Sequence, residues 1–223
     1  MLEYERQTEI MTGEFLQILI VFGAAYLIGS LPVAYFVAGL RHVDIFEVGS
    51  GNMGATNVVR VMGLGWGIAV WLLDSMKAVV AILLATQVIY PQNPTIATVV
   101  AAIGAIIGHN WSLMVAAITG RMRGGKGAAT AFGTLIMIVP IQVIAGILLA
   151  GGIVLALTRY VSLTVLVMFP LATVWMFVLA AQGKTPELFA VYCLLMVVMI
   201  FVRFRSNIER LRAGTERRLG ESR

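Results

Sequence analysis

Long stretches of apolar residues restrict what this chain can fold into more than any other feature. They cover residues 15–40, 64–90, 96–119, 128–158, 161–181 and 188–202. Most exceed the ~18–20 residues that an α-helix needs to cross the hydrocarbon core of a bilayer. Unpaired backbone groups are too costly in lipid, and no ten-residue alternating pattern indicates a barrel. The sequence therefore predicts an all-α integral membrane protein.

The few charged residues indicate an orientation. Only 12% of the residues are charged, whereas a soluble domain carries ~25%. Segment 1–14 has one arginine against four glutamates, whereas segment 203–223 has seven arginines. Because lysine and arginine favour cytoplasmic loops, we expect 1–14 outside the cell. The loops at 41–60 and around Lys126, and the basic tail 203–223, are then cytoplasmic.

This orientation requires an odd number of crossings, and six runs counted once give an even number. The run 128–158 contains Pro140 and is long enough for two short helices that turn near residues 140–144. Divided in this way, the chain is one polytopic domain, 1–223, with about seven transmembrane helices. The alternative is a single tilted, kinked helix over 128–158, which would leave the tail outside.

The first cytoplasmic loop is rich in groups that bind phosphate. Residues 48–60 read VGSGNMGATNVVR. Phosphate and glycerol oxygens are bound well by the groups that this loop offers: the guanidinium of an arginine, side-chain amides, a hydroxyl and the backbone N–H groups of glycines. The candidate binding residues are Ser50, Gly51, Asn52, Asn57 and Arg60. The alternative is a turn-rich loop in which glycine and asparagine only satisfy local geometry.

A second glycine-rich loop, Gly124-Gly125-Lys126-Gly127, is predicted to bind an anion at the membrane edge. Its glycines let backbone N–H groups crowd around a phosphate, and Lys126 supplies charge. Alternatively, Lys126 is an interfacial anchor that extends to the lipid headgroups. The loop lacks the Gly-x-x-x-x-Gly-Lys-Ser/Thr pattern, so nucleotide binding is unsupported.

Three ionisable residues fall inside predicted spans. His109 is expected to face an interior site, since such residues in membranes usually do, although a histidine that only packs between helices is the alternative. Asp74 and Lys77 are spaced to meet on one helical face, and a structural ion pair is the favoured interpretation of them.

Several enzyme classes are excluded. The chain has two histidines and one cysteine, Cys193, and no cluster with metal-ligand spacing. It lacks the Gly-x-Ser-x-Gly elbow of serine hydrolases and the His-x₄-Asp pattern of other glycerolipid acyltransferases. Any chemistry would therefore use an already activated substrate, and the protein would mainly position phosphates. No metal or cofactor is predicted.

These motifs resemble one known family, the bacterial membrane acyl-phosphate:glycerol-3-phosphate acyltransferases of the PlsY type. The residues that carry the resemblance are 50–60, Asp74 with Lys77, Gly108-His109, 124–130, 160–163 and 207–211. The resemblance covers almost the whole chain from Phe15 to Gly214. It implies a multi-pass protein of the bacterial cytoplasmic membrane with three cytoplasmic motifs and no metal.

The activity that the resemblance implies is transfer of a fatty acyl group from acyl phosphate to the 1-hydroxyl of sn-glycerol 3-phosphate. The partners are then acyl phosphate, glycerol 3-phosphate and membrane lipids, with no nucleic acid. An acyltransferase that uses another alcohol and a membrane anion-binding or transport protein are the alternatives.

We predict that transfer proceeds without a covalent acyl-enzyme. Lys126 would stabilise the leaving phosphate, and Arg60, Ser50 and Asn207 would hold glycerol 3-phosphate. The family resemblance adds Ser162 as a contact of the glycerol hydroxyls. A substrate phosphate oxygen would take the hydroxyl proton, with His109 as the protein's one candidate base.

The chain departs from the family pattern at three places. Trp111-Ser112 stands where the family has Phe-Pro, and His109 lies 17 positions before Lys126, which indicates an insertion. Phe204 replaces a histidine three residues before Asn207, so weaker or altered acceptor binding is expected, and Phe204→His should raise kcat/KM for glycerol 3-phosphate. The alternative is that Arg203 or Arg205 compensates for the missing histidine. Arg217 and Arg218, in a solvated tail, are expected to be dispensable.

Overall fold

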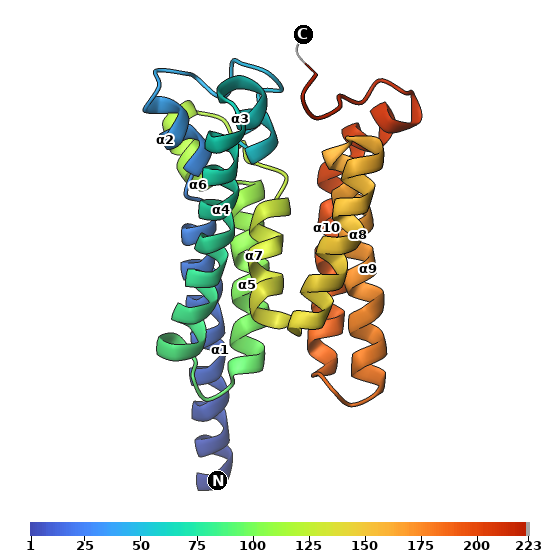
Figure 1. Cartoon of the computed structure of the whole chain (residues 1–223). Coiled ribbons are helices and arrows are strands. Elements are labelled where there is room, and N and C mark those ends of the chain that lie inside the picture. The colour runs from blue at the N-terminus through green and yellow to red at the C-terminus, as the bar shows by residue number, and fades with distance from the viewer. Residues whose placement is uncertain (222–223) are drawn as a thin grey trace.

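The computed structural model describes residues 1–221, and every extended regular element among them is helical. Seven longer helices form the bundle, and three short helices and a π-helical turn connect them (Figure 1). The bundle consists of α1 (Leu2–Gly29), α4 (Leu64–Leu84), α5 (Pro94–Asn110), α7 (Ala128–Ile138), α8 (Ile141–Thr158), α9 (Val161–Ala181) and α10 (Glu187–Arg212). The connecting elements are α2 (Val33–Gly39), α3 (Ala55–Met62), η1 (Ala85–Ile89) and α6 (Leu113–Thr119).

The prediction of seven membrane helices agrees with this architecture. Five described segments are long and apolar enough to cross a bilayer, and α5 and α7 are shorter apolar helices. The two chain ends lie at opposite ends of the bundle (Figure 1), as an odd number of crossings requires. The run 128–158 is two helices, because α7 ends at Ile138 and Pro140 caps the start of α8. Proline has no N–H to continue the helical ladder.

Two predicted spans differ from the structure at their ends. The run 15–40 is not one helix, because α1 ends at Gly29 and Pro32 caps the separate helix α2. The run 96–119 breaks after Asn110, where the Ser112 side chain accepts a hydrogen bond from the Val115 N–H and starts α6. At the N-terminus, α1 already begins at Leu2, so segment 1–14 is a helical extension of the first span.

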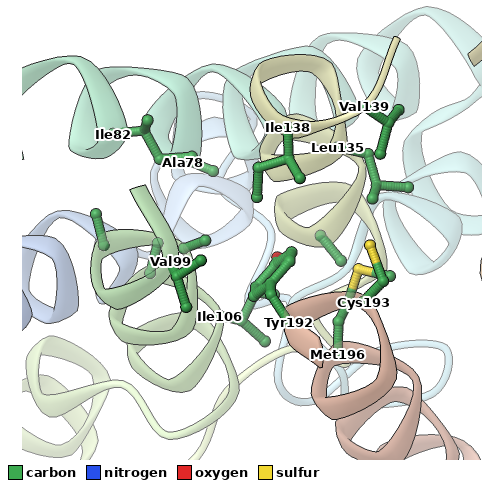
Figure 2. Packing of buried hydrophobic residues seen from close by; sticks show 14 of the residues in the cluster. Ala78, Ile82, Val99, Ile106, Leu135, Ile138, Val139, Tyr192, Cys193 and Met196 are labelled. Carbon is green, nitrogen blue, oxygen red and sulfur yellow. The ribbon is translucent and has the colours of Figure 1, made fainter. Parts of the chain in front are cut away.

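The core lies where α4, α5, α7 and α10 meet. Figure 2 shows Ala78 and Ile82, Val99 and Ile106, Leu135 and Ile138, and Tyr192, Cys193 and Met196 from these four helices packed together. Small residues permit close packing, as is usual between helices in membranes. A Cβ at Gly108 of α5 would lie 2.1 Å from the Tyr26 carbonyl oxygen of α1.

The loops that carry the sequence motifs gather at one end of the bundle, beside the C-terminus (Figure 1). Helix α3 and the segments on either side of α6 lie there, above the ends of α4, α5 and α7. Helix α8 packs mainly on α9, and of its residues Val143, Ile147 and Gly151 are buried. The motifs are therefore brought together at the end of the bundle where α8 forms one outer wall.

Candidate active site

A cavity of about 430 Å³ opens among the motif segments, and its two parts differ in chemistry. The polar part is lined by Ser50, Asn52, Thr56, Arg60, Lys126, Asn207, Glu216 and Arg217. The apolar part is lined by Trp71, Phe132, Leu148, Leu155, Val165, Met168, Phe169 and Phe204. Leu148 and Gly152 of α8 line the cavity, are exposed, and belong to a helix that is long and apolar enough to cross a membrane. The cavity thus joins a charged region to exposed residues of an apolar helix.

Asn57 organises the first motif loop. Its Oδ1 atom accepts a hydrogen bond from the Ser50 N–H at 2.8 Å, and its Nδ2 atom donates to the Val48 carbonyl at 3.1 Å. The side chain is 2% exposed. Gly51 adopts a φ of +63° in the turn and is not part of the cavity wall. Ser50, Asn52 and Asn57 line the cavity, and Asn57 together with Gly51 also shapes the loop.

Gly124 and Gly125 allow the second loop to lie directly on the end of α5. A Cβ at Gly124 would be 2.3 Å from the Asn110 carbonyl oxygen, and one at Gly125 would be 2.0 Å from His109 Nε2. The Gly125 N–H donates to the His109 carbonyl at 3.0 Å. We predicted that these two glycines present N–H groups to phosphate. In the structure they mainly allow close packing, and only Lys126 and Gly127 of the loop line the cavity.

Arg203 of α10 fixes the other side of this loop. Its Nη2 atom donates to the Gly125 carbonyl at 2.6 Å, and its guanidinium lies 5.2 Å from the Trp111 ring centre. Arg203 is therefore committed to the loop backbone. Arg203 is absent from the cavity lining, so it does not take the place of the histidine of the family pattern.

Lys126 extends from the loop toward α10. Its ammonium group donates a hydrogen bond to Asn207 Oδ1 and lies 5.2 Å from the centre of the Phe204 ring. Burial is the largest effect that lowers the pKa of the Lys126 ammonium to about 8, and the charge of Arg210 adds to it. A lysine in this state is a cation that gains from a nearby anion.

Two helices begin at the cavity. The N-terminal residues of α3 and α7, together with their N-cap residues Gly54 and Gly127, line its wall. Neither N-cap residue has a side chain that accepts the first N–H groups of its helix. These free N–H groups and the positive ends of the helix dipoles form an anion site. Lys126 and Arg60 add full positive charges to it.

Asp74, Lys77 and His109 form a buried cluster beneath the loop. The Lys77 ammonium is 2.7 Å from Asp74 Oδ1 and 2.9 Å from His109 Nδ1. The predicted Asp74–Lys77 ion pair is therefore present. Lysine can only donate, so His109 Nδ1 is the acceptor and the neutral ring carries its proton on Nε2. His109 and Asp74 also line the cavity.

The segment after α10 returns to the site, and the prediction of a solvated tail from residue 203 is wrong for this part. The Glu216 carboxylate accepts hydrogen bonds from Ser162 Oγ at 2.8 Å, Asn207 Nδ2 at 2.5 Å and Arg210 Nε at 2.7 Å. Burial alone would raise the pKa of the Glu216 carboxyl, but these hydrogen bonds outweigh it and hold the pKa below its usual range. Glu216 thus joins α9 to the end of α10.

Two hydrogen bonds between Leu219 and Arg159, one of them from the arginine side chain, fix the tail further along. The Leu219 N–H donates to the Arg159 carbonyl at 2.7 Å, and Arg159 Nη2 donates to the Leu219 carbonyl at 2.7 Å. As a result Arg217 lines the cavity, although its side chain is exposed as we expected. Arg218 points to the outside and contacts Tyr160. No sequence motif had marked Glu216 or Arg217, because their position depends on how the chain folds back.

Fold and site together define a multi-pass membrane protein whose cavity suits a phosphate joined to an apolar chain. Residues 19–214 match the family described as glycerol-3-phosphate acyltransferase. A glycerol-3-phosphate acyltransferase of Halalkalibacterium halodurans is 40% identical over 204 residues, which cover 91% of this chain and 95% of that protein. One from Thermus thermophilus is 40% identical over 197 residues, covering 88% of this chain and 92% of that protein. The chain belongs to the glycerol-3-phosphate acyltransferase family.

Solved structures agree with this assignment. The glycerol 3-phosphate form of PlsY, an integral membrane glycerol 3-phosphate acyltransferase, superposes with a TM-score of 0.78 at 32% identity, covering 91% of this chain and 96% of that one. The lysophosphatidic acid form of the same enzyme gives a TM-score of 0.77 at 31% identity, covering 91% and 95%. The all-α membrane fold and the family resemblance predicted from sequence are confirmed.

Proposed function

We propose that this protein transfers a fatty acyl group from acyl phosphate to the 1-hydroxyl of sn-glycerol 3-phosphate. The products are 1-acylglycerol 3-phosphate, a precursor of phospholipids, and inorganic phosphate. The observation that carries the proposal is the cavity itself, in which two helix N-termini and two cations face an apolar region that reaches the lipid-exposed side of α8. The relatives' names supply the acceptor, and the family resemblance supplies the donor.

The polar part of the cavity has enough cationic groups for two phosphates. Lys126 and the first N–H groups of α7 would bind the phosphate of the acyl donor. Arg60, Ser50 and the first N–H groups of α3 would bind glycerol 3-phosphate, with Arg217 at the mouth. Ser162 and Asn207 carry the Glu216 carboxylate here. Their predicted contacts with the acceptor require that they share their hydrogen bonds with it.

The apolar part would hold the acyl chain. Phe132, Met168 and Phe169 face it, and Leu148 and Gly152 of α8 border both the cavity and the outer surface. Burial of CH₂ groups stabilises such a complex by about 0.8 kcal/mol for each group. The donor would place its mixed anhydride between the two polar loops and leave its tail toward the bilayer.

The reaction would need no covalent intermediate. The 1-hydroxyl oxygen attacks the acyl carbon, the bond from that carbon to the phosphate oxygen breaks, and a phosphate oxygen takes the hydroxyl proton. Lys126 would stabilise the negative charge that grows on the leaving phosphate. Because His109 Nδ1 already accepts from Lys77, the neutral ring has no free base on that side. This contact supports a substrate phosphate as the base and His109 Nε2–H as a donor.

We further propose that the protein lies in the bacterial cytoplasmic membrane with its N-terminus outside. The site-bearing loops and the tail are then cytoplasmic, where water-soluble glycerol 3-phosphate is accessible. The excess of lysine and arginine at that end of the bundle supports this orientation.

The test is an acyl-transfer assay with the purified chain in lipid nanodiscs. Radiolabelled glycerol 3-phosphate is supplied with palmitoyl phosphate or with palmitoyl-CoA, and glycerol and dihydroxyacetone phosphate serve as competing acceptors. We expect lysophosphatidate from palmitoyl phosphate and glycerol 3-phosphate. Product only from palmitoyl-CoA would refute acyl phosphate as the donor. Preference for another alcohol would refute glycerol 3-phosphate as the acceptor. Anion flux through liposomes without any transfer would favour a transport protein.

A further inference from the structure

Phe204 stands where the family has a histidine, and the structure gives it a direct contact with Lys126. The ring lies 5.2 Å from the Lys126 ammonium and is 6% exposed, at the edge of the cavity. Asn207, one helical turn later on α10, accepts a hydrogen bond from the same ammonium group. Two residues on one face of α10 therefore hold the same cation.

We propose that Phe204 is a positioning residue for Lys126: its ring face and the Asn207 amide together hold the ammonium so that its remaining N–H points at a phosphate in the cavity. An ammonium has three donors. Asn207 takes one, and the negative face of the ring attracts the charge on a second side. The inference rests on the proposed role of Lys126 in binding the leaving phosphate.

The charge around Lys126 explains why such a contact matters. Positive groups surround it on three elements: Arg60 on α3, Arg203 and Arg210 on α10, and Arg217 at the cavity mouth. Glu216 is the carboxylate that faces it, and the Asp74–His109 cluster lines the same cavity. These arginines disfavour a charged lysine. An aromatic face stabilises the charged form without an anion that would compete with substrate phosphate.

A histidine would act differently at this position. Protonated, it would add another positive charge beside Lys126, and neutral, it would offer a smaller ring. For acyl phosphate, the contact between Phe204 and Lys126 therefore gives an expectation of its own, separate from the one stated for glycerol 3-phosphate. We expect Phe204→His to lower kcat/KM for acyl phosphate rather than raise it.

The decisive test changes the ring's charge distribution and leaves its shape. Phenylalanine with one, two or three ring fluorines is introduced at position 204 by nonsense suppression in the full chain in nanodiscs. Each fluorine weakens the attraction between a cation and the ring face. We expect log kcat/KM to fall steadily with fluorine number, with a total loss of about 3- to 30-fold, the range of one desolvated cation–π contact. The same series at Phe201, exposed on α10 one turn earlier, is the control.

A second measurement does not depend on acyl transfer. Lys126 is one of three lysines, and its reactivity toward trace acetic anhydride at different pH values, followed by mass spectrometry, reports its pKa. That pKa is about 8 in the parent. Phe204→Leu removes the ring face, so the midpoint is expected at lower pH, whereas Phe204→Tyr should keep it.

These results separate the two claims. A flat fluorine series together with an unchanged Lys126 midpoint in Phe204→Leu would overturn the positioning role and leave the proposed function intact. A shifted midpoint in a protein that transfers no acyl group would support the contact and refute the proposed function. If Phe204→Leu lowered kcat/KM by the same factor at every pH, Phe204 would be a packing residue only.

Discussion

His109 Nε2 lies so close to the Gly125 backbone that a Cβ on Gly125 would be 2.0 Å away from it. The loop that carries Lys126 therefore rests on the end of α5 through a residue with no side chain. Gly125→Ala is expected to displace the loop or the imidazole, and it should lower kcat/KM by at least tenfold and also lower the thermal stability, since overpacking costs about 1–3 kcal/mol. Gly65→Ala, where a Cβ has open space, is the control. Unchanged kinetics in Gly125→Ala would mean that this contact does not position the loop.

Asn57 is predicted to act through the fold of the first loop. Asn57→Ala removes the hydrogen bonds to the Ser50 N–H and the Val48 carbonyl, and each such bond contributes about 0.5–1.5 kcal/mol. We expect a lower melting temperature and a higher KM for glycerol 3-phosphate. Asn52→Ala, which alters a cavity wall residue, should raise KM with little change in melting temperature. If Asn57→Ala raised KM for glycerol 3-phosphate without lowering the melting temperature, Asn57 would bind the substrate directly and would not act by stabilising the loop.

The two arginines of the tail should differ. Arg217 lines the cavity mouth and Arg218 faces outward against Tyr160. Arg217→Ala should raise KM for the phosphate substrates about fivefold, as loss of one partly solvated charge contact of ~1 kcal/mol would. Arg218→Ala should stay within twofold of the parent. Steady-state kinetics at low ionic strength measures KM for both variants. Equal KM values in Arg217→Ala and Arg218→Ala would mean that Arg217 does not line the cavity in solution.

The Glu216 contacts predict a pH dependence of stability. The pKa of this carboxyl is depressed in the folded protein, so its contribution is present above the unfolded value of about 4.3 and is lost as the pH falls through the folded pKa. At pH 7, Glu216→Gln should cost about 1.5–3 kcal/mol, the worth of hydrogen bonds to a charged group. The difference in melting temperature from the parent should shrink below about pH 4. Glu209→Gln, exposed on α10, should show no such trend. A difference in melting temperature between Glu216→Gln and the parent that stayed constant across pH would contradict the role given to the charged Glu216 carboxylate.

Helix number and fold class followed from sequence because the length of an apolar run is dictated directly by the bilayer. The break at Pro140 was predictable for a local reason, the missing N–H of proline. The breaks after Gly29 and Asn110 were not, although Pro32 and Ser112 could have indicated them.

The site was predictable by residue type and less so by role. Arg60, Lys126 and Asn207 reach the cavity as their chemistry suggested. The roles of Gly124 and Gly125 depend on how closely α5 approaches, and that of Asn57 depends on the path of the loop around it. The positions of Glu216 and Arg217 depend on a contact of the tail with α9. None of these relationships is local in sequence.

The role of Lys126 is tested most directly by kcat for acyl transfer from palmitoyl phosphate to glycerol 3-phosphate. This kcat is measured in Lys126→Ala and, as a control, in Lys184→Ala. Lys184 is exposed in the α9–α10 connection, away from the cavity. Loss of one charge that stabilises a leaving group typically costs ~10²–10³ in rate. We predict that loss in Lys126→Ala and parental kcat in Lys184→Ala, with both proteins folded. Equal kcat in the two variants would contradict the claim that Lys126 stabilises the departing phosphate.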